Sequence, residues 1–239
     1  MNRALPVAVL LFIALTGCTA AVEGEPVGTV GGGARSVVRM LPDRGELSAV
    51  IGARMQFGND GAAGGTDLRD LDSDDSAGGC LGVKRSGARR AYPASHIRDA
   101  VANAWETVNT DPHFNVHVAV VELDSVDDAQ AAYSRITAQW QQCRGKTVYA
   151  MNPAGTERLF AYQFTRVDGS EGMLTANVMQ STVNLSSQST PSQRALTAVS
   201  QYLVDADVYS MSWRTGDPIV TDNAEAVAHL IASKIDSSL

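Results

Sequence analysis

Residues 116–143 carry the strongest structural signal in the sequence: VHVAVVEL (Val116–Leu123) leads into SVDDAQAAYSRITAQWQQC (Ser125–Cys143). The first part is rich in β-branched residues, which predicts a strand. In the second part, acidic residues follow Ser125, apolar residues recur at helical spacing, and Gly145 lies just beyond the end. This pattern predicts a long amphipathic helix that packs against the strand's sheet.

Further strands are predicted on both sides of this stretch from alternating or β-rich composition. Ala100–Val108 contains enough Ala and Glu for a helix, but we assign it to a strand because it directly precedes VHVAVVEL. The other predicted strands are Leu81–Lys84, Thr147–Met151, Leu159–Val167, Met173–Leu185 and a pair within Arg194–Ser212.

Two more helices are predicted, at Asp43–Met55 and Thr221–Ile235, because each places apolar residues on one face behind a capping residue. Strands in hairpin order with few helices predict an α+β domain. We expect an antiparallel sheet with two or three helices packed on one face, in a single domain over residues 37–239.

The N-terminus predicts export and membrane attachment. A single charge, Arg3, precedes the apolar run Ala4–Ala14, which suits a signal peptide and is too short for a membrane span. The following Leu15-Thr16-Gly17-Cys18 resembles the bacterial lipobox. We therefore expect residues 1–17 to be removed and Cys18 to be acylated; the alternative is an ordinary secretory signal with a chance cysteine.

If Cys18 is acylated, the Gly-rich residues 18–36 form a lipidated flexible tether. The protein would then be lipid-anchored to the cell membrane on its extracytoplasmic side. Only Cys80 and Cys143 remain, and in an oxidising compartment they predict a disulfide. Closing this loop of about 64 residues would stabilise the fold by about 4 kcal/mol in the chain-entropy model.

Composition narrows the classes of partner. The 239 residues are 44% hydrophobic and 19% charged, as in a folded globular protein, and a net charge of −7 argues against a nucleic-acid partner. A basic group at Lys84, Arg85, Arg89 and Arg90 either binds an anionic group or neutralises the neighbouring acidic loop.

The sequence contains no motif of a common enzyme class, and we predict neither a catalytic residue nor a cofactor. Asp70, Asp72 and Asp74 imitate the start of a calcium loop, but the glycine and bidentate glutamate that such a loop needs are missing. No metal site is therefore predicted.

Several local motifs together resemble the extracellular sensor domain of PknH-type receptor kinases of mycobacteria. They are Gly79-Cys80-Leu81-Gly82, Ala91-Tyr92-Pro93, VHVAVVEL, Gln139-Trp140-Gln141-Gln142-Cys143 and Gln193-Arg194-Ala195-Leu196. The resemblance covers residues 45–236 and implies extracytoplasmic sensing rather than a reaction. It also implies a second disulfide, whose places here correspond to Ser192 and about Ser210, so that this link is absent.

The resemblance and the predicted anchor favour a domain that binds an envelope-derived apolar or amphiphilic ligand. Aromatic residues suit such a cleft, whereas Trp140, near Cys143 on its helix, is expected to pack against the disulfide. A protein–protein interaction module without a cleft and an enzyme of unrecognised class remain alternatives, and no protein partner is predicted. The cleft candidates are Tyr92, Trp105, Tyr162 and Trp213.

Overall fold

The computed structural model describes most of the predicted domain. Cys18 and its tether, the aspartates of the acidic loop and Trp213 lie outside the described residues. The described residues are 37–58, 63–64, 68, 79–84, 86–92, 96–110, 113–152, 154, 156–183, 185–210 and 223–238.

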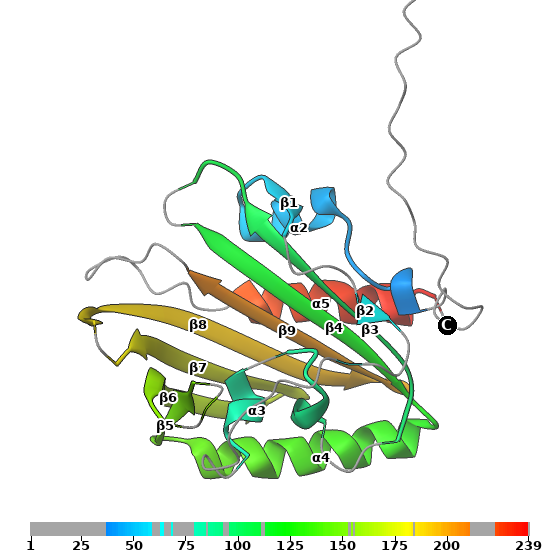
Figure 1. Ribbon diagram of the computed structural model, residues 1–239. Coiled ribbons are helices and arrows are strands. Elements are labelled where there is room, and N and C mark those ends of the chain that lie inside the picture. The colour runs from blue at the N-terminus through cyan, green and yellow to red at the C-terminus, as the bar shows by residue number, and fades with distance from the viewer. Residues whose placement is uncertain are drawn as a thin grey trace, which may run out of the picture.

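One antiparallel sheet of nine strands organises the domain (Figure 1). Its order is β1-β3-β4-β9-β8-β7-β6-β5, and β2 pairs with β3 beside β1. The strands are β1 (Met55–Phe57), β2 (Ala63–Gly64), β3 (Ile97–Thr107), β4 (Phe114–Leu123), β5 (Thr147–Met151), β6 (Arg158–Ser170), β7 (Met173–Thr182), β8 (Leu185–Val199) and β9 (Tyr202–Ser210). The predicted α+β class with a single antiparallel sheet is confirmed.

The central strands bury side chains on both faces of the sheet. In β4, Val118 and Val120 belong to one core cluster, whereas Val121 and Leu123 belong to another. Because successive side chains of a strand point to opposite faces, these clusters are two separate cores on the two sides of the sheet. Each face of the central strands therefore needs its own cover.

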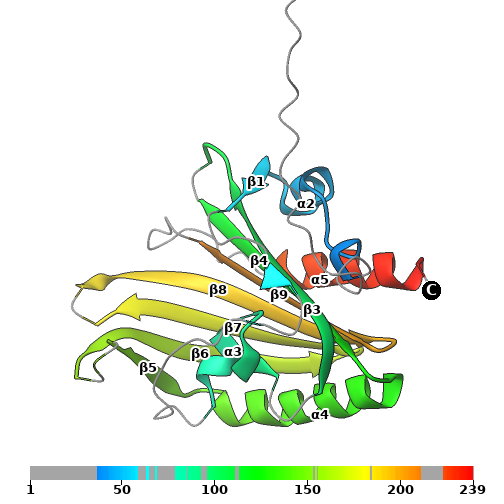
Figure 2. The ribbon, with the colours of Figure 1, turned by 45° about the vertical axis from the view of Figure 1, so that its right-hand side comes forward.

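Helices supply that cover on both faces, so the prediction that they pack on one face is wrong. Helix α4 (Val126–Cys143) contributes to the core of Val121, whereas α2 (Arg44–Ile51) and α5 (Asn223–Asp236) contribute to the core of Val118. Figure 1 shows α5 behind the strands and the short helix α3 (Leu81–Lys84) in front of them, and Figure 2 shows α2 beside α5.

Helix α4 carries the chain from β4, in the middle of the sheet, to β5 at its edge. It begins where predicted, with the Ser125 side chain accepting a hydrogen bond from the backbone N–H of Asp128. Its buried stripe faces the sheet and consists of Ala129, Ala132, Ile136, Trp140 and Cys143.

Within the described residues, no helix has the length and apolar character needed to span a membrane.

The helix α2 is shorter than the predicted Asp43–Met55. Asp43 and Glu46 cap its start reciprocally, but Gly52 takes a left-handed conformation with φ of 74° and ends it, so that Met55 starts β1. The other predicted strands between residues 97 and 210 are present, including β3 over Ala100–Val108 except its last residue. However, β7 ends at Thr182, and Leu185 begins β8, which starts before the strand pair predicted within Arg194–Ser212.

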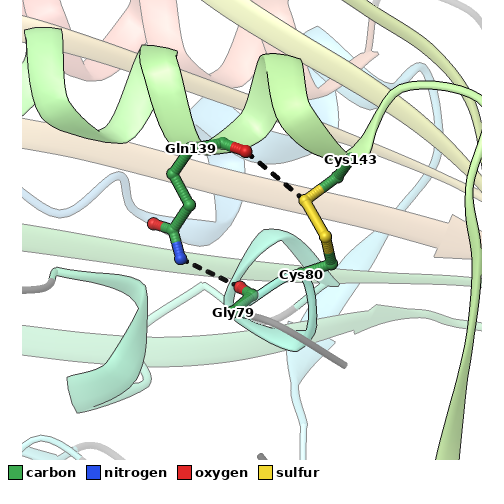
Figure 3. Close-up of a disulfide and its surroundings, with 4 residues drawn as sticks. All are labelled: Gly79, Cys80, Gln139 and Cys143. Atoms are coloured by element: carbon green, nitrogen blue, oxygen red, sulfur yellow. Dashed lines mark hydrogen bonds between the residues drawn. A yellow bond between two sulfur atoms is a disulfide. The ribbon is translucent and has the colours of Figure 1, made fainter. Parts of the chain in front are cut away.

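The predicted strand Leu81–Lys84 is a helical turn instead, and tertiary contacts explain the difference. Gly79 adopts a left-handed φ of 81°, and Cys80 forms the predicted disulfide with Cys143 at the end of α4. The side-chain amide of Gln139 donates to the carbonyl oxygen of Gly79 at 2.9 Å (Figure 3). A Cβ on Gly79 would lie 2.6 Å from that amide nitrogen, so any other residue would strain the backbone and displace the Gln139 side chain.

Candidate functional site

Five buried side chains form a charged cluster on the face of the sheet that α3 and α4 cover. Each is at most 5% exposed, and they come from four separate elements of the fold. The charged cluster consists of Lys84 from α3, Tyr92 from the turn after the short helix η2 (Arg89–Ala91), Arg194 from β8, and Asp205 and Asp207 from β9.

A two-pronged ion pair lies at the centre of the charged cluster. The Nε of Arg194 donates to Oδ1 of Asp205 at 2.7 Å, and a second guanidinium nitrogen donates to Oδ2. The third guanidinium nitrogen donates to the carbonyl oxygen of Gly82, and the guanidinium carbon lies 4.8 Å from the centre of the Trp140 ring. Arginine suits this position because its planar guanidinium can donate to a carboxylate and to a carbonyl while its face packs on an aromatic ring.

Tyr92 completes the surroundings of Asp205. Its hydroxyl donates to Oδ2 of Asp205 at 2.6 Å and accepts from the backbone N–H of Gly87 at 3.1 Å. Burial, and then the charge of Asp205, raise the pKa of Tyr92 well above 10. Burial alone would lower the pKa of Arg194, but the charge and hydrogen bonds of Asp205 outweigh it and raise that pKa. Tyr92 is therefore neutral and Arg194 charged at neutral pH.

The motifs that resemble the PknH-type sensor domain meet at this ion pair. The guanidinium of Arg194 donates to the carbonyl oxygen of Gly82 and lies over the ring of Trp140. The hydroxyl of Tyr92 donates to Asp205. A Cβ on Gly82 would lie 3.0 Å from the carbonyl oxygen of Arg90, which is tighter than most real contacts. Segments up to 113 residues apart in sequence thus form hydrogen bonds with one buried ion pair.

The second pair of the cluster lies next to several aromatic rings. The Nζ of Lys84 is 3.6 Å from Oδ2 of Asp207, 5.0 Å from the centre of the Tyr209 ring and 6.0 Å from that of Tyr162. These two rings continue to Phe160 and His117, whose ring centres lie 6.4 Å from Tyr162 and 5.3 Å from Tyr209, respectively. We call Phe160, Tyr162, Tyr209 and His117 the aromatic row.

The aromatic row reaches the surface, because Phe160, Tyr209 and His117 are only half-buried. Beside it lie two buried polar atoms that have no hydrogen-bond partner among the described residues, Oδ1 of Asp207 and Oγ of Ser192. Ser192 is the cross-strand partner of Tyr209, and Asp207 that of His117, so all four side chains share one face of the sheet.

The structure brings together some of the residues predicted from sequence and separates others. Tyr92 and Tyr162 lie in the core on the face of the charged cluster, whereas Trp105 is buried in the core on the opposite face. Trp140 shares the core of the disulfide, as expected. The fourth cleft candidate, Trp213, lies outside the described residues.

Sequence reasoning missed the charged cluster itself. In the strand YLVDADVYS, Asp205 and Asp207 alternate with apolar residues, and this pattern indicates two acids on one buried face. Lys84 is buried against Asp207, whereas Arg89 and Arg90 are exposed, so these residues do not form one basic surface. In the part of the chain that the structure describes, no three His, Cys, Asp or Glu side chains gather as metal ligands.

Ser192 and Ser210, which correspond to the cysteines of the family's second disulfide, do not face one another in the structure. Ser192 pairs with Tyr209 across the strands, so Ser210 is one residue out of register. Because neighbouring side chains of a strand point to opposite faces, Ser192 and Ser210 point away from one another.

Comparison with known proteins gives one family and one well-matched fold. The family model described as PknH-like extracellular domain matches residues 34–234. The crystal structure of the extracellular domain of PknH from Mycobacterium tuberculosis is 22% identical, with a TM-score of 0.68 and coverage of 85% of this chain and 96% of that one. A looser match is the Rv0999 ortholog from Mycobacterium smegmatis, at 11% identity and a TM-score of 0.43, covering 84% of this chain and 95% of that one. No curated protein sequence matches the chain.

Arg194→Met should destabilise the protein by about 3–5 kcal/mol, because it leaves the Asp205 carboxylate buried without its cation. The double variant Arg194→Met/Asp205→Leu should recover much of that loss. Urea unfolding of both variants measures this difference. Arg166→Met, which breaks an exposed pair with Asp168, is the matched control and should cost less than about 1 kcal/mol. If Arg194→Met and Arg166→Met lowered the free energy of unfolding equally, a central role of the buried pair would be contradicted.

Tyr92 should make folding sensitive to alkaline pH. Its folded pKa is raised above the unfolded value near 10, so its contribution to stability is complete below pH 10 and is lost as pH rises towards the folded pKa. In a titration followed by tyrosinate absorbance, Tyr92→Phe should remove one late-titrating tyrosine and leave the number titrating near pH 10 unchanged. Loss of a tyrosine from the normally titrating group would refute this assignment.

Proposed function

Since this chain belongs to the family of PknH-like extracellular domains, we propose that it is a lipid-anchored extracytoplasmic sensor domain that binds a small amphiphilic molecule of the cell envelope. In this proposal the domain recognises its ligand and performs no chemistry on it. Cys18 holds the domain at the membrane, and residues 18–36 let it reach ligands near the surface.

The observation that carries the proposal is the aromatic row with unpartnered polar atoms beside it. Buried polar atoms in proteins are almost always hydrogen-bonded, and each one without a partner destabilises the fold. Oδ1 of Asp207 and Oγ of Ser192 are two such atoms, and they lie beside aromatic rings that reach the surface. Aromatic walls with a few convergent polar groups are typical of small-molecule sites.

The charged cluster supports binding rather than catalysis. Arg194 and Asp205 are held by one another, by Tyr92 and by Gly82, which leaves them no freedom to act on a substrate. Lys84 is likewise placed against Asp207 and two rings. Side chains that are held by several interactions form a rigid surface against which a ligand can bind.

The alternative of a protein–protein interaction module receives less support from the described surface. Its exposed large apolar residues are Val38, Phe57, Val126 and Val183. Phe57 lies on β1 at one edge of the sheet, Val126 starts α4, and Val183 follows β7 near the other edge. An interaction surface usually gathers such residues into a contiguous patch. The described residues therefore favour a small ligand as the partner.

Cys18→Ala should move most of the protein from the membrane to the soluble fraction, because it removes the only residue that the lipobox-like motif offers for acylation. Fractionation after a high-salt wash, with immunodetection, measures this. Thr19→Ala, which keeps the cysteine, is the control and should stay in the membrane. If Cys18→Ala still sediments with membranes, the protein is held by something other than this lipid.

Ligand binding should raise the melting temperature. A ligand at a hundredfold excess over its Kd stabilises the fold by about 2.7 kcal/mol, which is roughly 5–10 °C for a domain of this size. A thermal-shift screen of the full-length protein in detergent against fractionated envelope lipids should therefore yield at least one such increase.

The same screen with two variants locates the binding site. Tyr209→Ala removes a ring of the aromatic row and should abolish the shift, whereas Tyr149→Ala removes a ring from β5 that contacts Arg158 and should preserve it. A shift that survives Tyr209→Ala, or no shift with any fraction, would argue against ligand binding at this surface.

A further inference from the structure

We infer that the part of the ligand held by the aromatic row is a neutral, hydroxyl-bearing ring, of the kind that a sugar residue of a glycolipid or oligosaccharide presents. This inference rests on the proposed function and narrows it to one chemical class. Three properties of the site lead to it: its charge balance, its unpartnered hydrogen-bonding atoms and its ring surfaces.

The charges of the site cancel. Lys84 and Arg194 carry two positive charges, and Asp205 and Asp207 carry two negative charges, with each cation placed against one of the acids. A charged headgroup would have to leave water for a site whose described residues offer no net opposite charge, and burying a charge without a partner is strongly unfavourable. The balance therefore disfavours phosphate, carboxylate and ammonium ligands and favours a neutral one.

The unpartnered atoms require hydrogen-bonding groups on the ligand. Oδ1 of Asp207 accepts hydrogen bonds, and Oγ of Ser192 both donates and accepts. An acyl chain would leave both atoms unsatisfied. A sugar hydroxyl would donate to the Asp207 carboxylate, which forms stronger hydrogen bonds than a neutral acceptor, and another would pair with Ser192.

The rings beside these atoms suit the flat, weakly polar face of a sugar ring. Tyr209 is half-buried, stands directly across from Ser192 and has its hydroxyl 3.3 Å from Nε2 of His117. The electron-rich faces of aromatic rings attract the positive edges of C–H bonds. A ligand on the half-buried rings of Tyr209 and His117 would thus lie beside Ser192 and Asp207, which share their face of the sheet.

The test measures the affinity of the full-length protein for soluble probes by calorimetry. The probes are neutral trisaccharides of glucose, mannose and galactose, the charged sugars glucuronate and glucosamine, and hexanoate as a molecule without hydroxyl groups. We expect at least one neutral trisaccharide to bind in a saturable manner, and the charged sugars and hexanoate to bind at least about tenfold more weakly.

Ser192→Ala is the decisive variant, because the Ser192 hydroxyl has no hydrogen-bond partner in the described part of the chain. Its loss should therefore leave the melting temperature unchanged or slightly higher. It should weaken binding of the neutral sugar about threefold to tenfold, as expected for one lost hydrogen bond. Asp207→Asn should weaken binding by about tenfold. Asp99→Asn, at a buried carboxylate on β3 that also has an unpartnered oxygen, is the matched control and should bind like the wild type.

The outcomes separate this inference from the proposed function. If hexanoate binds in competition with envelope lipids and no neutral sugar does, the sugar assignment is overturned while ligand binding stands. If a neutral sugar binds but Ser192→Ala and Asp207→Asn have no effect, the assignment to this site is overturned. If none of the probes binds and the envelope fractions give no thermal shift, both the inference and the proposed function fail.

Discussion

The buried ion pair between Arg194 and Asp205 constrains the rest of the structure. A guanidinium and a carboxylate that are both essentially inaccessible to water must have their hydrogen-bonding groups satisfied by the protein, or the pair would strongly destabilise the fold. The chain meets this demand with the carbonyl of Gly82, the hydroxyl of Tyr92 and the ring of Trp140. Strands β8 and β9, helix α4 and the segment from α3 to Tyr92 are consequently held in one arrangement.

The disulfide and the ion pair act on the same segment from two sides. A four-residue helix such as α3 is too short to be stable alone, so its position depends on what holds it. Cys80 ties its start to the end of α4, while Gly82 and Lys84 within it contact Arg194 and Asp207. This double attachment places Lys84 between the rings of Tyr162 and Tyr209, where the proposed binding surface begins.

The motifs that resemble the PknH-type sensor domain lie at the two links that hold this fold together, the buried ion pair and the disulfide. Identity to the extracellular domain of PknH is 22%, yet the overall fold is similar. In this chain, four of the five motifs that suggested the resemblance supply groups to the buried pair or the disulfide; VHVAVVEL is the exception. Other core side chains need only be apolar and of suitable size. A protein core tolerates the exchange of one apolar residue for another more readily than a buried charge without a partner. The second disulfide implied by the resemblance is absent, and the β8–β9 pair forms without it.

Local sequence signals predict the strand at Val116–Leu123, the capped helix from Ser125 and, taken together, a single antiparallel sheet. They also predict the disulfide, because Cys18 belongs to a lipobox-like motif and Cys80 and Cys143 are the other two cysteines. Contacts between distant segments are what make α3 helical, place helices on both faces of the sheet, and set Asp205 and Asp207 against cations. Each of these outcomes depends on partners far away in the chain, such as Gln139 for Gly79 and Arg194 for Gly82, and periodicity within a segment carries no information about such partners.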